Sequence, residues 1–165
     1  FLASWGVAWC AVEAAKAAQA GASLDEVASA AADCASGMHL YFVVDTLEYL
    51  ERNGRIGRAE AFLGTLLRFK PVLTFEDGVV TPVERIRGRS RVLARLVEIF
   101  DENAEGDSNT VTVIHGAAEE RAEKHVGMLS EKPRIEAALV GKVGPVIGCH
   151  SGPGLVGICF YQPQQ

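Results

Sequence analysis

The stretch VLTFEDGVVTPVERIR, residues 72–87, places the dipeptide Asp77-Gly78 between two runs rich in β-branched and aromatic residues. An Asp-Gly pair in this position is the strongest short-range signal for a β-hairpin, because a two-residue hairpin turn needs residues that tolerate positive φ. The sequence therefore predicts two antiparallel strands at this point of the chain.

The chain upstream of this hairpin begins with two predicted helices. Residues 2–20 are alanine-rich and helical in pattern, and Gly21 can supply the left-handed residue that ends such a helix. Ser23 and Glu26 have the spacing of a capping box, which predicts a second helix that continues to about Gly37. We therefore expect the first 37 residues to form a helical hairpin.

A predicted strand and a short helix follow. The run HLYFVV, residues 39–44, is β-branched and aromatic, which favours a buried strand. Asp45 can cap a helix over residues 46–53, and Gly54 can end it. Apolar residues then recur at helical spacing over residues 59–67, just before the hairpin.

Helical and extended patterns alternate downstream of the hairpin. Helices are predicted over residues 90–104 and 117–132, and strands over residues 110–116, 135–143 and 155–161. The expected fold class is therefore α/β, of the α+β kind, with a mixed or antiparallel sheet and flanking helices.

Composition excludes several classes of function. The 165 residues suit one ordinary domain. A formal net charge of −5 and a pI near 5.4 remove the phosphate attraction on which nucleic-acid binders rely, so no nucleic-acid partner is expected. No run approaches the ~20 apolar residues of a bilayer span, and the start of the chain lacks a signal-peptide pattern. We therefore expect a cytoplasmic protein without stable membrane insertion.

Cysteine and histidine spacing gives no metal site. The four cysteines are spread along the chain without a C-x-x-C pair, which argues against a zinc or thioredoxin-type motif and favours reduced, mostly buried thiols. His115 and His125 lie on different predicted elements, with no partner at metal-ligand spacing. No metal or cofactor is expected.

The stretch GPVIGCHSGPG, residues 144–154, surrounds His150 with glycine and proline. Its four glycines would let the backbone approach a ligand closely and would leave N–H groups free for an anion. The alternative is that the glycines shape a tight crossing between two strands, with His150 bonded to a carbonyl. The stretch is neither a Walker A loop nor a dinucleotide-binding fingerprint.

Arginines form a second candidate cluster. Arg85 and Arg87 lie on one face of the predicted strand, where their guanidiniums could share a target, and Arg89 and Arg91 continue the series. Arg55 follows the glycine that ends a predicted helix. Each of these arginines could equally belong to a solvated surface.

Three classes of function remain open on the residues alone. An anion-binding α/β domain is one. A small-molecule hydrolase or phosphotransferase that uses His150 as acid or base is another, although Cys149 and Ser151 lack the arrangement of an activated nucleophile. A structural or dimerisation module built on the alanine-rich hairpin is the third.

Three blocks of the sequence resemble one known family. YFVVDTLEYLERNGRIGR (41–58), LLRFKPVLTFEDGVVTPVERIRGRSR (66–91) and VGPVIGCHSGPGLVGICFY (143–161) are similar, in order and spacing, to the carboxyl-terminal domain of the DegV family of bacterial fatty-acid-binding proteins. The first 37 residues resemble the helices that link the two domains of these proteins. The resemblance implies a division into a linking helical hairpin (1–37) and a carboxyl-terminal DegV domain (38–165), with a separate amino-terminal α/β domain before them.

The resemblance also implies a function. A long-chain fatty acid would lie between the two domains, and the protein would present its carboxyl group to a fatty acid kinase and then carry the acyl phosphate. Such a protein is a carrier and not an enzyme, and its only bound small molecule would be the fatty acid.

Four residues carry the ligand-binding role that the resemblance implies. Arg55 matches the arginine of the family's glycine-glycine-arginine-isoleucine turn, although Asn53 replaces its first glycine. Arg87 matches the arginine after the hairpin, and His150 matches the histidine of the glycine loop. Ser151 keeps a hydroxyl where the family has threonine, whereas the other threonine is replaced by a cysteine.

Overall fold

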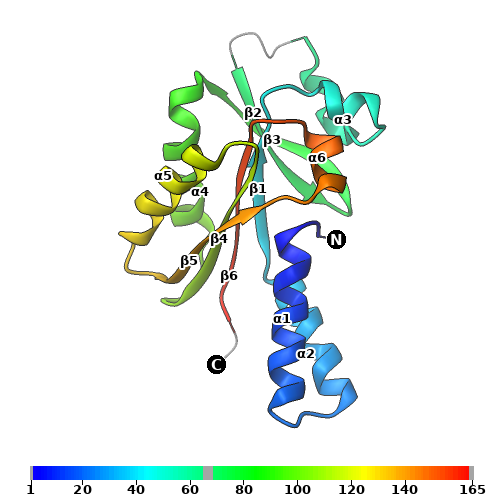
Figure 1. Cartoon of the computed structure of the whole chain (residues 1–165), viewed down its shortest axis with the longest axis vertical. Helices are drawn as coiled ribbons and strands as arrows, with labels where there is room; N and C mark the ends of the chain where they lie inside the picture. The colour runs from blue at the N-terminus through cyan, green and yellow to red at the C-terminus, as the bar shows by residue number, and fades with distance from the viewer. Residues whose placement is uncertain (1, 65–68, 164–165) are drawn as a thin grey trace.

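The computed structural model describes residues 2–64 and 69–163, and its centre is a six-stranded sheet with the strand order β3-β2-β1-β6-β4-β5 (Figure 1). Neighbouring strands are antiparallel except β4 and β5, which are parallel. The expected mixed sheet with flanking helices is therefore confirmed. The strands are β1 (His39–Val43), β2 (Phe69–Glu76), β3 (Val79–Arg87), β4 (Asn109–Gly116), β5 (Ile135–Lys142) and β6 (Leu155–Tyr161).

The predicted hairpin is formed by β2 and β3. Asp77 and Gly78 connect them with φ values of 52° and 80°, and Glu76 pairs with Val79 across the turn. Positive φ at both central residues is the geometry of a type I′ turn, whose twist matches that of the flanking strands. Pro82 is tolerated within β3 because this strand lies at the edge of the sheet.

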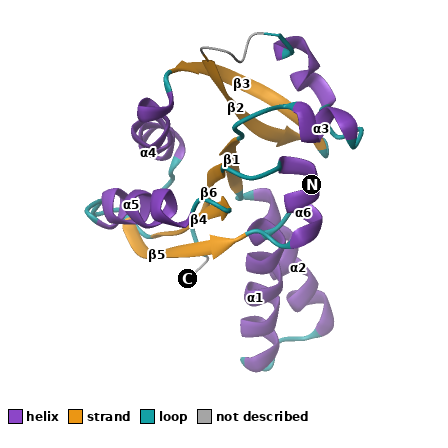
Figure 2. Ribbon diagram, turned by 45° about the horizontal axis from the view of Figure 1, so that its top comes forward, coloured by secondary structure: helices purple, strands orange, loops and turns teal. Residues whose placement is uncertain are grey.

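Helices cover both faces of the sheet (Figure 2). One face packs against α4 (Val92–Asn103), which follows the short 3-10 helix η2 (Arg89–Arg91), and against α5 (Glu119–Ser130). The other face packs against α1 (Trp5–Gln19), α3 (Glu48–Arg52), η1 (Gly57–Phe62) and α6 (Pro145–Ser151). Two apolar cores result, one on each side of the sheet.

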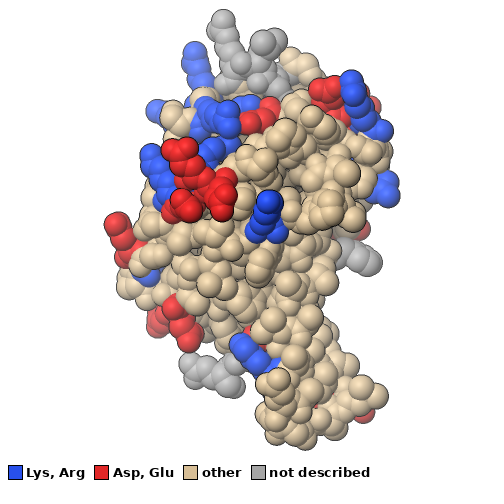
Figure 3. All heavy atoms as spheres, in the orientation of Figure 1, with Lys and Arg blue, Asp and Glu red and all other residues tan. Residues whose placement is uncertain are grey.

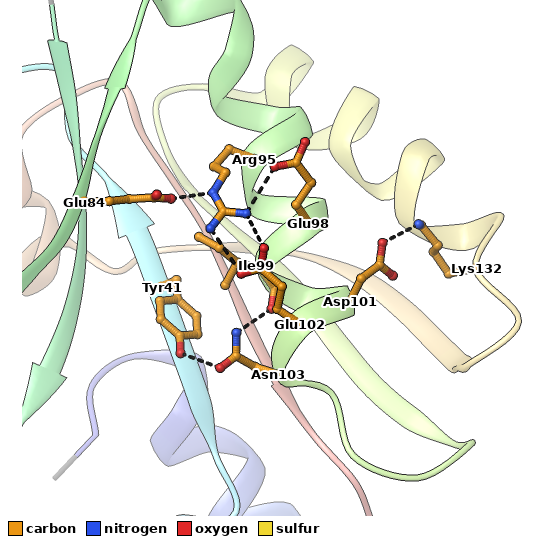
Figure 4. A network of polar contacts seen from close by, with 9 residues as sticks. All are labelled: Tyr41, Glu84, Arg95, Glu98, Ile99, Asp101, Glu102, Asn103 and Lys132. Atoms are coloured by element: carbon orange, nitrogen blue, oxygen red, sulfur yellow. Dashed lines mark hydrogen bonds and ion pairs between the residues drawn. The ribbon is translucent and has the colours of Figure 1, made fainter.

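Ion pairs of Arg95 connect α4 to the sheet (Figure 4). Arg95 lies 2.6 Å from the carboxylate of Glu84 on β3, 2.7 Å from that of Glu102 and 3.1 Å from that of Glu98. These carboxylates raise the pKa of Arg95 further above its usual range. One guanidinium thus joins two turns of α4 to an edge strand.

The first two helices form the expected hairpin, which extends away from the sheet (Figure 1). Ser23 and Glu26 make both hydrogen bonds of a capping box at the start of α2 (Leu24–Ser36). Trp9 on α1 donates a 2.8 Å hydrogen bond to the hydroxyl of Thr112 on β4, which attaches the hairpin to the sheet. The division of the chain between residues 37 and 38 remains a prediction.

Two predicted helices differ from the structure. The helix expected over residues 46–53 is the shorter α3, and the one expected over residues 59–67 is the 3-10 helix η1, which ends at Phe62. Residues 65–67 lie outside the described residues. The expectation of buried, reduced thiols is confirmed for Cys34 and Cys159, whereas Cys149 is exposed. Burial raises the pKa of Cys159 to about 12.

Candidate functional site

The candidate site lies at the end of the sheet where β1, β4 and β5 finish and β6 begins. β1 and β4 both run antiparallel to β6, and β5 runs parallel to β4, so their carboxyl ends meet. Because α3 follows β1 and α6 joins β5 to β6, these two helices come together there (Figure 2). The side chain of Asn53 links them by donating a 3.1 Å hydrogen bond to the carbonyl of Cys149.

The predicted glycine loop is largely a helix, and the expectation that its N–H groups are free for an anion is wrong for three glycines. Pro145 occupies the first turn of α6, where its missing N–H costs nothing. Gly148 and Gly152 donate their N–H groups along the helix, to Gly144 and Gly148. Gly154 donates its N–H to the carbonyl of Gly116 at 2.7 Å.

Two of these glycines are required by close packing against the protein itself. Gly152 and Gly154 have φ values of 70° and 89°, which L side chains rarely adopt. A Cβ at Gly152 would overlap the ring of Tyr49, and a Cβ at Gly154 would overlap the carboxylate of Asp45. The glycines therefore let the α6–β6 connection lie against α3 and the end of β1.

An apolar cavity of about 390 Å³ opens beside this connection. Its volume falls in the range of small-molecule sites, about 300 to 1,000 Å³. Its apolar walls come from the sheet, the α3–η1 connection, α6 and the segment before α1. They include Leu2, Leu40, Phe42, Leu50, Phe75, Val80, Ile114, Val143, Ile147 and Leu155.

Three of the four predicted site residues line this cavity: Arg55, His150 and Ser151. Arg55 is set by a Schellman turn at the end of α3, in which Gly54 donates to Glu51 and Arg55 donates to Leu50 at 2.8 Å. Arg55 forms no ion pair with any residue that the structure describes. Its Nη1 donates a long 3.4 Å hydrogen bond to the carbonyl of Gly54, and no carboxylate of the described residues prevents the guanidinium from meeting an anion.

His150 and Ser151 lie next to each other at the end of α6. Within residues 2–64 and 69–163, the buried Nδ1 of His150 has no hydrogen-bond partner. Ser151 is buried, and its hydroxyl donates only a long 3.3 Å hydrogen bond to the carbonyl of Gly152. Both side chains keep hydrogen-bonding capacity at the wall of a mainly apolar cavity.

Arg87, the fourth predicted residue, is exposed and is not among the residues that line the cavity. It ends β3, opposite Phe69, at the same end of the sheet. Lysine and arginine side chains gather around the start of α4 in Figure 3. The guanidinium of Arg85, the other arginine of the predicted pair, lies 4.7 Å from the ring centroid of Phe62.

The described part of the chain holds no group of three or more His, Cys, Asp or Glu side chains that could bind a metal ion. Within that same part, none of the helices combines the length and the apolar character needed to cross a bilayer.

The sequence and the fold both match one family. A model of the DegV family of uncharacterised proteins matches residues 1–163. The chain belongs to the DegV family. Among curated relatives, a DegV domain-containing protein of Streptomyces coelicolor is 44% identical over 151 residues, which cover 91% of this chain and 54% of that protein. The DegV protein of Bacillus subtilis is 43% identical over 122 residues, which cover 73% of this chain and 43% of that protein.

Solved DegV structures share the fold. A fatty-acid-binding DegV family protein of Thermus thermophilus has a TM-score of 0.87 at 35% identity, over 95% of this chain and 57% of that one. DegV of Bacillus subtilis, described as a fatty acid binding protein, has a TM-score of 0.80 at 35% identity, over 94% and 56% of the two chains. The chain thus spans about half the length of the DegV proteins that it matches.

Sequence reasoning missed the apolar walls of the site. Leu40 and Phe42 lie on a strand that is apolar on both faces, so nothing in the sequence separates cavity residues from core residues. The helical pattern over residues 2–20 includes Leu2 and Ser4, whereas in the structure they form the segment before α1. The glycine-rich stretch around His150 indicates a polar site in this part of the chain, but nothing in it indicates the apolar walls.

Proposed function

We propose that this chain is one half of a fatty-acid carrier, whose cavity takes part of a long acyl chain and whose polar rim holds the carboxylate. A preceding amino-terminal domain would cover the remainder of the ligand. The observation that carries the proposal is an apolar cavity lined by Arg55 and His150: among the described residues, Arg55 has no carboxylate partner and the buried Nδ1 of His150 has no hydrogen-bond partner. DegV proteins described as fatty-acid-binding support it.

The acyl tail would supply most of the affinity. About 15 methylenes at about 0.8 kcal/mol each give roughly 12 kcal/mol as an upper bound, before the costs of association. The walls of the cavity are suited to this burial because they consist mainly of aliphatic and aromatic side chains.

The head group needs compensation for its charge. A carboxylate that is removed from water without a partner costs several kcal/mol. Arg55 can bind both oxygens of a carboxylate, because the guanidinium donates hydrogen bonds in a planar fork. His150 and the Ser151 hydroxyl can donate further hydrogen bonds, and an acyl phosphate would use the same three donors.

The proposed partner is a fatty acid kinase that phosphorylates the bound carboxylate in the cytoplasm, after which this protein carries the acyl phosphate. Arg87 suits the surface that such a partner would meet, because it is exposed at the end of the sheet that holds the site. Two further cations, Lys70 and Arg89, lie 3.4 Å and 3.1 Å from the carboxylate of Asp45, which follows β1 at this end of the sheet. The protein itself would act as a carrier without catalysing a reaction.

Native mass spectrometry of the full-length protein, purified from bacteria, tests the binding role. We expect a co-purified mass in the range of a long-chain fatty acid, and less of it in the His150→Ala protein. Repeated spectra of ligand-free wild-type protein would reject fatty-acid binding. Turnover of an ester or a phosphate compound that is lost in His150→Ala would instead favour a hydrolase or phosphotransferase.

A transfer assay tests the kinase role. We expect Arg87→Ala to lower the rate of phosphorylation of the bound fatty acid by a partner kinase, with little change in melting temperature. Lys132→Ala is the matched control, because Lys132 is a surface cation that pairs with Asp101 on the α4–α5 side of the sheet. An equal effect of the two substitutions would contradict a partner surface at Arg87.

A further inference from the structure

One wall of the cavity comes from the short segment Leu2–Ser4, which precedes α1 and belongs to no strand or helix. Its backbone is tied to the start of α1, because Gly6 donates to the carbonyl of Ala3 and Ala8 donates to that of Ser4, each at 3.2 Å. The position of this wall therefore follows the position of the first turn of α1.

Leu2 and Ser4 are held in a specific arrangement. Gly6 is buried beneath Leu2, and a Cβ at Gly6 would lie 3.3 Å from the Cβ of Leu2. Ser4 has a φ of 54°, which is uncommon for a residue with a side chain, and it makes no capping hydrogen bond to α1. Such a conformation persists only when the surrounding structure fixes it.

Trp5 fixes the first turn of α1 to the sheet. Its indole lies over Gly141 on β5, where a Cβ would overlap the ring, and its Nε1 donates a 3.3 Å hydrogen bond to the carbonyl of Lys142. The next residue, Val143, lines the cavity, whereas Trp5 itself does not. Trp5 thus connects two walls of the cavity, the segment Leu2–Ser4 and the end of β5 next to Val143, without lining the cavity itself.

We propose that Trp5 and Gly141 are a positioning pair that sets the shape of the cavity and thereby the acyl chains that it admits. The inference rests on the proposed fatty-acid binding. Protein interiors are close-packed and transmit small displacements, so a shift of the indole moves Leu2–Ser4 with it. Only glycine at position 141 lets the ring lie against the strand.

The test is Gly141→Ala in the full-length protein. Gly141 does not have a positive φ, so alanine suits its backbone and its only conflict is with neighbouring side chains, chiefly the indole. We expect the affinity for stearic acid to fall roughly tenfold, the equivalent of losing contact with one or two methylenes. The affinity for a shorter acid, such as lauric acid, should fall less, so the ratio of the two should change.

Gly127→Ala on α5 is the matched control, because nothing lies within 4 Å of a Cβ at that position. It should leave both affinities unchanged. A second variant, Gly141→Ala with Trp5→Leu, removes the conflict with the indole and leaves only the milder one with Cγ2 of Thr112, 2.8 Å from the added Cβ, so it should fold even where the single variant does not. We expect its melting temperature to exceed that of Gly141→Ala, and its ratio of stearic to lauric affinity to differ from that of the wild type.

Two results overturn the inference in distinguishable ways. If the wild-type protein binds stearic acid and Gly141→Ala and the double variant keep its chain-length ratio, the pair contributes to stability alone. If the wild-type protein binds neither acid, fatty-acid binding itself fails and this inference fails with it.

Discussion

His125 lies on α5 with its side chain fully buried, and neither ring nitrogen has a hydrogen-bond partner among the described residues. Burial is the main cause that lowers the pKa of this imidazole from 6.5 to about 4, and the positive charge of Arg121 adds to it. The unfolded chain therefore takes up this proton at a higher pH than the folded protein does. Acid in this range favours the unfolded state.

The size of the effect follows from the two pKa values. The contribution of the neutral His125 to the free energy of unfolding is fully present above pH 6.5 and is lost progressively as the pH falls towards 4. The free energy of unfolding should fall by about 2 kcal/mol between about pH 7.5 and about pH 5, and by about 3 kcal/mol once the folded state is also protonated.

Urea unfolding of the wild type and of His125→Leu at these two pH values measures the effect. The wild type should lose about 2 kcal/mol more than the variant on acidification. Burial also lowers the pKa of His39, but His39 is present in both proteins and its contribution cancels. Equal losses in the two proteins would refute the reasoning, because they would show that His125 does not titrate differently in the two states.

Three further predictions concern packing and charge. Arg95→Met should lower the free energy of unfolding by about 1 to 2 kcal/mol in low salt and by less in high salt, because it leaves three carboxylates near one another. Urea unfolding at two salt concentrations measures this difference. Gly154→Ala should lower the free energy of unfolding by at least about 2 kcal/mol, whereas Gly148→Ala, with open space around its Cβ, should leave it unchanged or raise it. Equal melting temperatures of the two variants would contradict the close packing at Gly154. Arg55→Ala should weaken binding of oleic acid more than binding of its methyl ester, measured by titration calorimetry, and equal losses would place Arg55 outside the head-group site.

Features that depend on neighbouring residues could be predicted from the sequence. Asp77-Gly78 specifies a turn through the φ values that its two residues accept, and Ser23 with Glu26 specifies a helix start through two reciprocal hydrogen bonds. Both signals lie within four residues, so no distant contact was needed to interpret them.

The order of the strands could not be predicted in this way. β6, the last strand, lies between β1 and β4, so its neighbours are set by contacts between residues that are far apart in the sequence. Helix α6 was missed for a different reason. It spans only seven residues and contains a glycine, so its apolar spacing was too short to distinguish a helix from a loop.

The candidate site likewise combines residues that the sequence indicates with an arrangement that depends on distant contacts. Arg55, His150 and Ser151 come from two connections nearly 100 residues apart, and only the family resemblance linked them before the fold was known. The apolar walls gave no signal, because the same residue types build a core and a lipid cavity. Arg87 matches the family pattern, but its role at a partner surface remains a prediction.

A crystal structure of the full-length protein grown with oleic acid tests the central claim most directly. We expect continuous density for an acyl chain in the cavity beside Leu40 and Phe42, with the carboxylate within hydrogen-bonding distance of His150 and Arg55. Density for the fatty acid elsewhere, or an empty cavity under saturating oleic acid, would contradict it.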